Sequence, residues 1–126
     1  MDVQILQVIF PIAWCANTAY GSWNPRIPSL NQCAVTALVV QDYLEGKILR
    51  TKLTNRSRHF LNRLPDGTVI DFTKDQLLYI SAKIINQETI VYSKSQLTRH
   101  KSVMRRYDLL SRRVRAILDH LPLPAI

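Results

Sequence analysis

The chain has 126 residues, of which 47% are hydrophobic, and its formal net charge at pH 7 is +8. This length and composition are typical of a globular domain with its own core and exclude an intrinsically disordered chain. We therefore expect a single domain over residues 1–126. Two cysteines are too few for a disulfide framework, so we expect reduced thiols and a cytoplasmic location.

The first residues predict neither a signal peptide nor a membrane anchor. They include the acidic Asp2 and no basic residue before Arg26, whereas a signal peptide begins with basic residues. Trp14 stands before Cys15, where a lipoprotein cleavage site requires a small residue. The apolar runs are too short to span a bilayer, so we expect no membrane partner.

Residues 3–14 predict a first helix that is apolar on much of its surface and is strained or ended near Pro11. Cys15 is expected to pack at this helix as an ordinary core residue. Residues 19–31 contain a glycine and two prolines, which predict a loop with Trp23 as its anchor.

A second helix is predicted from about residue 32 to residue 44. Ser29 or Asn31 is expected to cap its start, and Gly46 fits its end. The helix is apolar on nearly every side, so we expect it to be buried on most sides. Cys33 lies at its first turn, close to the partial positive charge of the helix dipole.

The middle of the chain predicts a strand over residues 47–53, followed by a hairpin in the sequence RHFLNRLPDGTVIDFT. Its turn fits a three-residue loop in which Pro65 begins a type I turn and Gly67 takes a left-handed conformation. This register keeps one face of the hairpin apolar, whereas a two-residue turn would place Asp71 among apolar side chains. It also puts His59 diagonal to Asp71 on the same face, within side-chain reach.

The last third of the chain predicts a short helix starting at Thr73 and a long amphipathic helix at the end. The apolar residues of the long helix recur at alternating intervals of four and three residues: Val103, Tyr107, Leu110, Val114, Ile117 and Leu121. Such a heptad-like seam packs against the core, and it leaves pairing with a second copy of the chain open.

Basic residues are concentrated in the same segment. Between Lys94 and His120 there are two acidic residues and eight basic ones, namely Lys94, Arg99, Lys101, Arg105, Arg106, Arg112, Arg113 and Arg115. A basic helix can bind nucleic acid or an acidic protein surface. We favour a solvated outer face, because charge runs usually have that role and no aromatic residue stands among these charges for stacking on bases.

Cys33, His59 and Asp71 together fit nucleophilic catalysis by a thiol. A helix N-terminus and a nearby imidazolium both favour the thiolate, which attacks carbonyl carbons. Asp71 would fix the histidine tautomer, and the Cys33 backbone N–H with the side chain of Gln32 or Asn31 would bind the oxyanion. The alternative is a buried core cysteine, since free cysteine is among the most buried residue types.

We expect neither a metal nor a cofactor. His100 and His120 lie among basic residues that are expected to be exposed, and they offer fewer ligands than a metal site needs.

Two stretches, NQCAVTALVVQDYLEGKI and HFLNRLPDGTVIDFT, make residues 14–76 resemble the small bacterial YunG-like proteins. Those proteins carry Gly-Gln-Cys before the same helix, then His with an aromatic and Asn, a turn, and Asp-Phe/Leu-Thr. Asn31 stands where the family has glycine. The resemblance places Cys33, His59, Asn62 and Asp71 on family positions. The order Cys, His, Asp is also similar to that of papain-like and transglutaminase-like enzymes.

We therefore expect an α+β fold in which a small antiparallel sheet packs on a buried cysteine-bearing helix, with further helices at both ends, as in a papain-like or transglutaminase-like core. The predicted activity is thiol-dependent acyl chemistry on an amide, with Cys33 as nucleophile, His59 as base and acid, and Asp71 as orienting group. Asn31, Asn62 and Trp23 are expected to complete the pocket. The alternatives are a catalytically degenerate module that binds a protein and a weak nucleic-acid binder.

Overall fold

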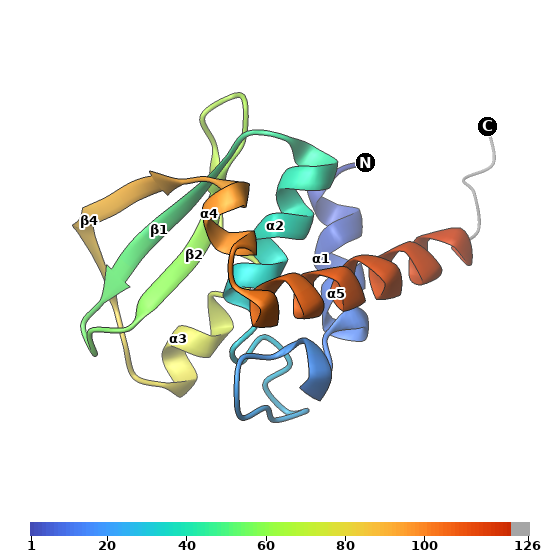
Figure 1. The fold of residues 1–126 in the computed structure, drawn as a ribbon, viewed down its shortest axis with the longest axis horizontal. Coiled ribbons are helices and arrows are strands. Elements are labelled where there is room, and N and C mark those ends of the chain that lie inside the picture. Colours follow the sequence, from blue (N-terminus) through green and yellow to red (C-terminus); the bar gives the residue numbers. More distant parts are fainter. Residues whose placement is uncertain (122–126) are drawn as a thin grey trace.

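The computed structural model describes residues 1–121, without the side chains of residues 86–88, and has the predicted α+β architecture (Figure 1). Its helical elements are α1 (Val3–Ala13), the 3-10 turn η1 (Ala16–Thr18), α2 (Cys33–Leu44), α3 (Asp75–Tyr79), α4 (Lys94–Thr98) and α5 (Lys101–Asp119). Its strands are β1 (Lys47–Leu53), β2 (Arg58–Arg63), β3 (Val69–Ile70) and β4 (Ile84–Tyr92). No helix among these residues is both long and apolar enough to span a membrane.

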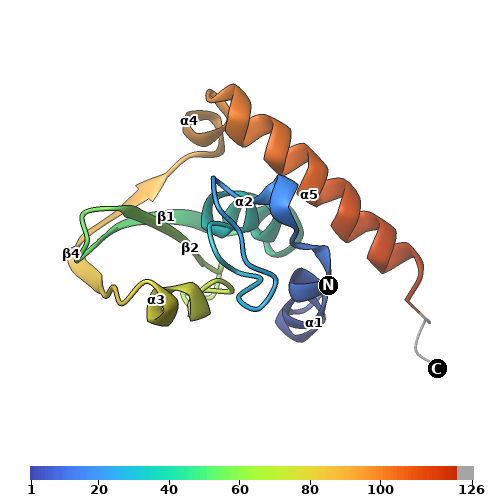
Figure 2. The same ribbon diagram turned by 90° about the horizontal axis from the view of Figure 1, so that it is seen from below.

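The cysteine-bearing helix α2 occupies the centre of the molecule. The sheet has the strand order β3-β2-β1-β4 with antiparallel pairs, and α2 packs on β2 on one side and on α5 on the other (Figure 2). Residues 35–40 of α2 are all buried, as predicted from their apolar character. Each large apolar side chain buried in this way contributes about 1.5–3 kcal/mol, which holds the first turn of α2 in place.

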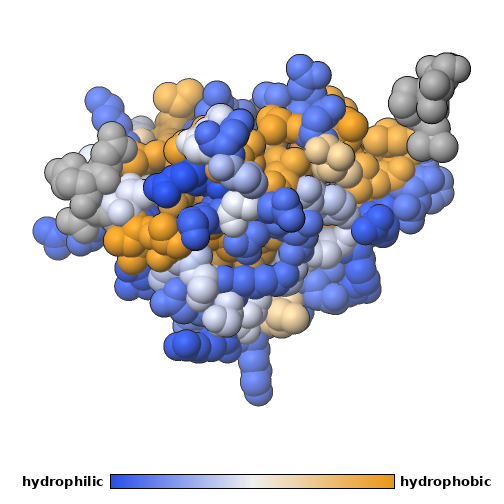
Figure 3. Space-filling model, turned by 90° about the horizontal axis from the view of Figure 1, so that it is seen from above, coloured by the Kyte–Doolittle hydropathy of each residue, from blue (hydrophilic) through white to orange (hydrophobic). Residues whose placement is uncertain are grey.

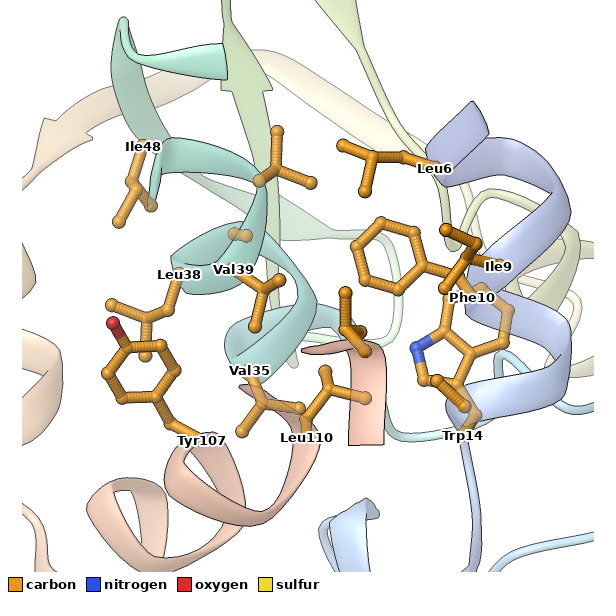
Figure 4. Packing of buried hydrophobic residues seen from close by; sticks show 14 of the residues in the cluster. Leu6, Ile9, Phe10, Trp14, Val35, Leu38, Val39, Ile48, Tyr107 and Leu110 are labelled. Atoms are coloured by element: carbon orange, nitrogen blue, oxygen red, sulfur yellow. The ribbon is translucent and has the colours of Figure 1, made fainter. Parts of the chain in front are cut away.

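The N-terminal helix α1 closes the core beside α2, where Phe10 stacks on Trp14 with ring centroids 5.5 Å apart (Figure 4). The predicted helix over residues 3–14, strained or ended near Pro11, is observed as Val3–Ala13. Pro11 lies in its last turn, two residues before its end, and the Trp14 N–H donates to the Phe10 carbonyl. Cys15 therefore lies outside the helix, and its side chain is partly exposed rather than packed in the core.

The start of α2 differs from the predicted cap. Gln32 occupies the N-cap position and makes no capping hydrogen bond with its side chain. Asn31 uses its side-chain N–H on the Ser22 carbonyl, 2.7 Å away, and the buried Ser29 hydroxyl has no partner among the described residues. The prediction that Ser29 or Asn31 caps the helix is therefore wrong, because the preceding loop holds these side chains elsewhere.

The predicted hairpin register is confirmed. Asn62 pairs with Ile70 across β2 and β3, and the Leu64 N–H donates to the Thr68 carbonyl at 2.8 Å. Gly67 has a φ of 91°, the left-handed conformation that a bulged three-residue turn requires. The pleat of the strands consequently directs His59 and Asp71 to the same side.

Two glycines with positive φ allow a matched stability test. A Cβ on Gly46 would lie 2.1 Å from the Arg63 backbone oxygen, whereas a Cβ on Gly67 would meet nothing within 4 Å. Gly67→Ala should cost about 1–2 kcal/mol for its left-handed backbone. Gly46→Ala should cost more, because the β2 backbone must also move. Urea unfolding of both variants checks this; equal losses would contradict the close approach of Gly46 to β2.

The elements after the hairpin were predicted less completely. The strand β4 was not predicted; it pairs with β1 and forms an edge of the sheet. Helix α3 begins at Asp75 rather than at Thr73, whose hydroxyl donates to Asp71 instead of capping the helix. The apolar seam of α5 is buried from Val103 to Val114, but Leu121 lies beyond the helix and is exposed.

Some large apolar side chains remain at the surface. Ile5, Val8 and Ile12 of α1 are exposed, and apolar patches lie between hydrophilic side chains on the face shown in Figure 3. The three residues are spaced by three and four positions, so they form one exposed apolar stripe along α1.

Candidate active site

The hairpin brings the imidazole of His59 and the carboxylate of Asp71 together. The distance from His59 Nε2 to Asp71 Oδ2 is 2.6 Å, and the side chains are 1% and 12% exposed. His59 comes from β2, and Asp71 follows β3 directly. The proximity is the one that the hairpin register predicted.

Asp71 is itself held in place by the residue two positions further on. Its Oδ1 accepts hydrogen bonds from the backbone N–H of Thr73 at 3.1 Å and from the Thr73 hydroxyl at 3.2 Å. These bonds fix the carboxylate plane and leave Oδ2 for His59. The Thr73 hydroxyl thus orients Asp71, which in turn orients His59.

The other ring nitrogen of His59 meets Gln76 from α3. Gln76 is 4% exposed, and its Nε2 lies 3.5 Å from His59 Nδ1, while its Oε1 accepts the Asn31 backbone N–H at 3.0 Å. Because an amide nitrogen can only donate, Gln76 can donate to Nδ1 only in the neutral form of the ring, with its proton on Nε2 facing Asp71. In that form Nδ1 is the nitrogen that can accept a proton. No motif in the sequence pointed to Gln76 as a site residue.

Cys33 is the first residue of α2 and is partly exposed. Burial is the largest influence on the His59 pKa and lowers it. The hydrogen bond to Asp71 and the influence of the Cys33 thiol and of both charges outweigh burial and raise the pKa to about 9. His59 is therefore coupled to both partners, and both of them are partly exposed, whereas His59 is buried.

The prediction that the basic residues of α5 form a solvated face is wrong for Arg106, which is 4% exposed. Its Nε donates to Ser102 Oγ at 3.3 Å, and its guanidinium carbon lies 5.4 Å from the centroid of the Tyr20 ring. Burial, followed by Arg105, lowers the pKa of Arg106, and the attraction of Cys33 opposes them. Arg106 thus stands within electrostatic reach of the Cys33 sulfur.

Gln32 and Asn31, the predicted oxyanion donors, organise the loop before α2. Gln32 is fully buried and its Nε2 donates to the Cys15 carbonyl at 3.0 Å, while its Oε1 has no partner among the described residues. Asn31 has a φ of 60° and accepts the Tyr20 backbone N–H. This is the left-handed conformation, which asparagine adopts more readily than most residues other than glycine.

Asn62 and Trp23, the other predicted pocket residues, hold parts of the scaffold. Asn62 is buried and its Nδ2 donates to the Ala37 carbonyl at 3.0 Å, which fixes β2 on α2. The Trp23 Nε1 donates to the Pro28 carbonyl at 3.0 Å, so Trp23 anchors its own loop. Within the part of the chain that the structure describes, neither side chain forms a hydrogen bond with Cys33 or His59.

Other possible sites lie elsewhere. A groove of about 520 Å³ between α5 and the C-terminal end of α2 is lined by Asp42, Tyr43 and Arg115 among others, at the opposite end of the helix from Cys33. Among residues 1–121, no group of three or more His, Cys, Asp or Glu side chains is placed to hold a metal ion.

Several basic side chains of the C-terminal segment have partners within the molecule. Lys94 pairs with Asp42 at 2.7 Å, Arg112 pairs with Asp108 at 3.0 Å, and Arg113 donates to the Ala13 carbonyl. The apolar seam of α5 faces the core. This arrangement is typical of a packed helix with a charged outer face.

We expect any binding of nucleic acid by this segment to be weak and to disappear as salt rises, because exposed cations bind phosphates by releasing counterions. Fluorescence anisotropy with a labelled duplex and a labelled single strand, at about 50 and 200 mM salt, measures it. Sequence-dependent binding that persists at the higher salt concentration would contradict this expectation.

Comparison with known proteins places the chain among bacterial relatives. A family model described as YunG protein matches residues 2–119. "Uncharacterized protein YunG" of Bacillus subtilis (strain 168) is 38% identical over 71 residues, which are 56% of this chain and 59% of that protein. The match thus spans less than two thirds of the relative's length. No solved structure matches the chain, so the papain-like or transglutaminase-like resemblance has no support from a structural relative.

Proposed function

The chain belongs to the YunG protein family, and we propose that it is a thiol-dependent enzyme of acyl chemistry that acts on an amide by hydrolysis, deamidation or transfer. One observation carries the proposal. The buried ring of His59 is bound to Asp71 through Nε2 at 2.6 Å and interacts with the partly exposed Cys33 thiol. This is the combination of nucleophile, base and orienting group that nucleophilic catalysis uses.

In the first half of the proposed reaction, His59 holds the Cys33 proton as an imidazolium, which its raised pKa of about 9 favours, and the thiolate attacks the carbonyl carbon of the amide. The carbon–nitrogen bond then breaks, and the imidazolium gives its proton to the leaving amine. A thioester on Cys33 remains. Asp71 stabilises the imidazolium by accepting the hydrogen bond from Nε2.

In the second half, neutral His59 takes a proton from water or from an acceptor amine, which attacks the thioester carbon. The carbon–sulfur bond breaks while His59 keeps this proton, so the sulfur leaves as the thiolate. Hydrolysis and transfer differ only in this second nucleophile. The thiolate and the imidazolium are restored, so the cycle needs no oxidant and no cofactor.

The N-terminus of α2 is suited to the negative charge that develops on the carbonyl oxygen. No side chain caps this turn, so the N–H groups of residues 33–35 are not occupied by a capping acceptor. Such N–H groups bind anions, and the helix dipole adds to the effect. We assign the oxyanion first to the Cys33 N–H. A contribution from the Gln32 amide stays a prediction, since its nitrogen donates to the Cys15 carbonyl.

We further infer a papain-like or transglutaminase-like core. The inference is supported by a cysteine at the start of the central helix and a histidine on the adjacent strand, with the aspartate following in chain order. Likeness of this kind does not establish a function. The cytoplasmic location and an amide-bearing partner belong to the same proposal.

The proposal is tested with p-nitrophenyl acetate, an activated ester that reports acyl transfer to a nucleophile. We expect release of p-nitrophenolate and a hydroxylamine-sensitive acetyl group on Cys33, located by peptide mass spectrometry. Cys15→Ser is the matched control and should react normally, whereas Cys33→Ser should not. No acetylation of Cys33, or acetylation of Cys15 instead, would favour the catalytically degenerate protein-binding module.

A further inference from the structure

The buried cation Arg106, which is under the electrostatic influence of Cys33, has no anionic partner among the described side chains. Arg106 is 4% exposed, yet no described residue forms a salt bridge with it. Burying a charge costs several kcal/mol unless it is paired, so buried arginines ordinarily face a carboxylate or another anion. One neutral hydrogen bond to Ser102 and the face of the Tyr20 ring compensate only part of this cost.

Arg106 is tied to the start of α2 through Tyr20. The Tyr20 backbone N–H donates to the Asn31 carbonyl at 2.8 Å, two residues before Cys33, and the guanidinium carbon lies 5.4 Å from the Tyr20 ring centroid. Tyr20 is 71% exposed, and the guanidinium lies over its ring. The charge of Cys33 also acts on Arg106. These contacts hold the guanidinium at the end of α2 that carries Cys33.

We propose that Arg106 binds a carboxylate of the substrate, and that the site acts on amides carrying a free carboxylate close to the scissile carbonyl. This inference rests on the proposed function, because it names the substrate class of the same site. The planar guanidinium can donate two parallel hydrogen bonds to one carboxylate, a geometry that suits this anion better than a neutral amide. Binding would supply the missing counter-charge and fix the carbonyl relative to the sulfur.

Two reagents of nearly equal size test the inference. Iodoacetate carries a carboxylate two bonds from the carbon that sulfur attacks, and iodoacetamide carries a neutral amide there. Arg106→Met removes the charge and keeps a long side chain. We expect it to lower the Cys33 labelling rate with iodoacetate, divided by the rate with iodoacetamide, by about 3- to 10-fold. Arg105→Met is the matched control, because Arg105 is exposed and should change the ratio far less.

The pattern of rates separates the competing roles. If Arg106 only stabilises the thiolate, Arg106→Met slows both reagents equally and the ratio stays constant. If it only packs against Tyr20, the melting temperature falls and the ratio again stays constant. Either result overturns the inference but does not affect the proposed roles of Cys33 and His59. If His59→Ala leaves the rate of Cys33 labelling unchanged with both reagents, the proposed function is overturned instead.

A second measurement uses the unchanged protein and does not depend on the folding of a variant. At constant ionic strength, acetate should protect Cys33 from iodoacetamide in a saturable manner, whereas acetamide should not. Labelling of Cys15 in the same sample is the internal control and should be unaffected by acetate. Equal effects of acetate and acetamide on Cys33 would contradict a carboxylate site at Arg106.

Discussion

Replacing His59 by alanine is expected to slow the alkylation of Cys33 by iodoacetamide at pH 6.5 by about 10- to 100-fold. At that pH about 1% of an ordinary thiol is ionised, whereas a thiolate paired with an imidazolium persists. Compared with an ordinary thiol, the labelling rate rises by a smaller factor than the ionised fraction, because a more stable thiolate is a weaker nucleophile. Rates are measured by quenched labelling and peptide mass spectrometry between pH 5.5 and 9.

Asp71→Asn should change the Cys33 rate in the same direction as His59→Ala but less, because the imidazole remains next to the sulfur. Cys15 provides the comparison within each sample. Both cysteines are partly exposed, so each serves as a reporter in the folded protein. Cys33→Ser should lower the unfolding free energy only by the part of the His59 proton binding that the sulfur supplies, since the side chain is not enclosed. Equal Cys33 labelling rates in the unchanged protein, His59→Ala and Asp71→Asn would contradict the pairing with His59.

The second large effect is a loss of stability on the alkaline side of neutrality. The His59 pKa is about 9 in the folded protein and near its ordinary 6.5 when unfolded. The folded state therefore binds this proton more tightly. The stabilisation is fully present below pH 6.5 and is lost as the pH rises through 9. It amounts to about 3 kcal/mol at 1.4 kcal/mol for each pH unit.

Urea unfolding at closely spaced pH values measures this dependence. His59→Gln removes the titrating group, so its unfolding free energy should vary less between pH 6.5 and 9 than that of the unchanged protein. Asp71→Asn keeps the imidazole but removes the hydrogen bond that raises its pKa, and it should also flatten the profile. A proton that Cys33 loses on folding opposes this slope below the ordinary thiol pKa of about 8.5, so the comparison with His59→Gln decides. The same pH dependence of the unfolding free energy in the unchanged protein and in His59→Gln would contradict the proposed state of His59.

The part of the site set by local structure could be predicted from the sequence. The turn around Gly67 determines which residues of β2 and β3 face the same side, and this rule places His59 beside Asp71 without knowledge of the remaining fold. The burial of α2 followed in the same way from its uninterrupted apolar residues. These predictions needed only the geometry of neighbouring segments.

The contributions of distant segments could not be predicted. Gln76 reaches His59 because α3 folds back toward the start of α2, and Arg106 reaches Cys33 because α5 crosses that helix (Figure 2). In the sequence, Arg106 is one of several basic residues, and only packing distinguishes it. Asn31 was expected to cap α2, but its side chain is held by the Ser22 carbonyl. Tertiary contacts overrode the local preference in this case.

The central claim is that Cys33 and His59 act as one coupled pair, and an NMR titration of the ¹⁵N-labelled imidazole tests it most directly. In the unchanged protein the ring nitrogens of His59 should titrate near pH 9. In Cys33→Ser the midpoint should fall, because the hydrogen bond and the charge of the sulfur no longer favour the imidazolium. Identical midpoints in the two proteins would contradict the coupling and, with it, the role of Cys33 as the nucleophile.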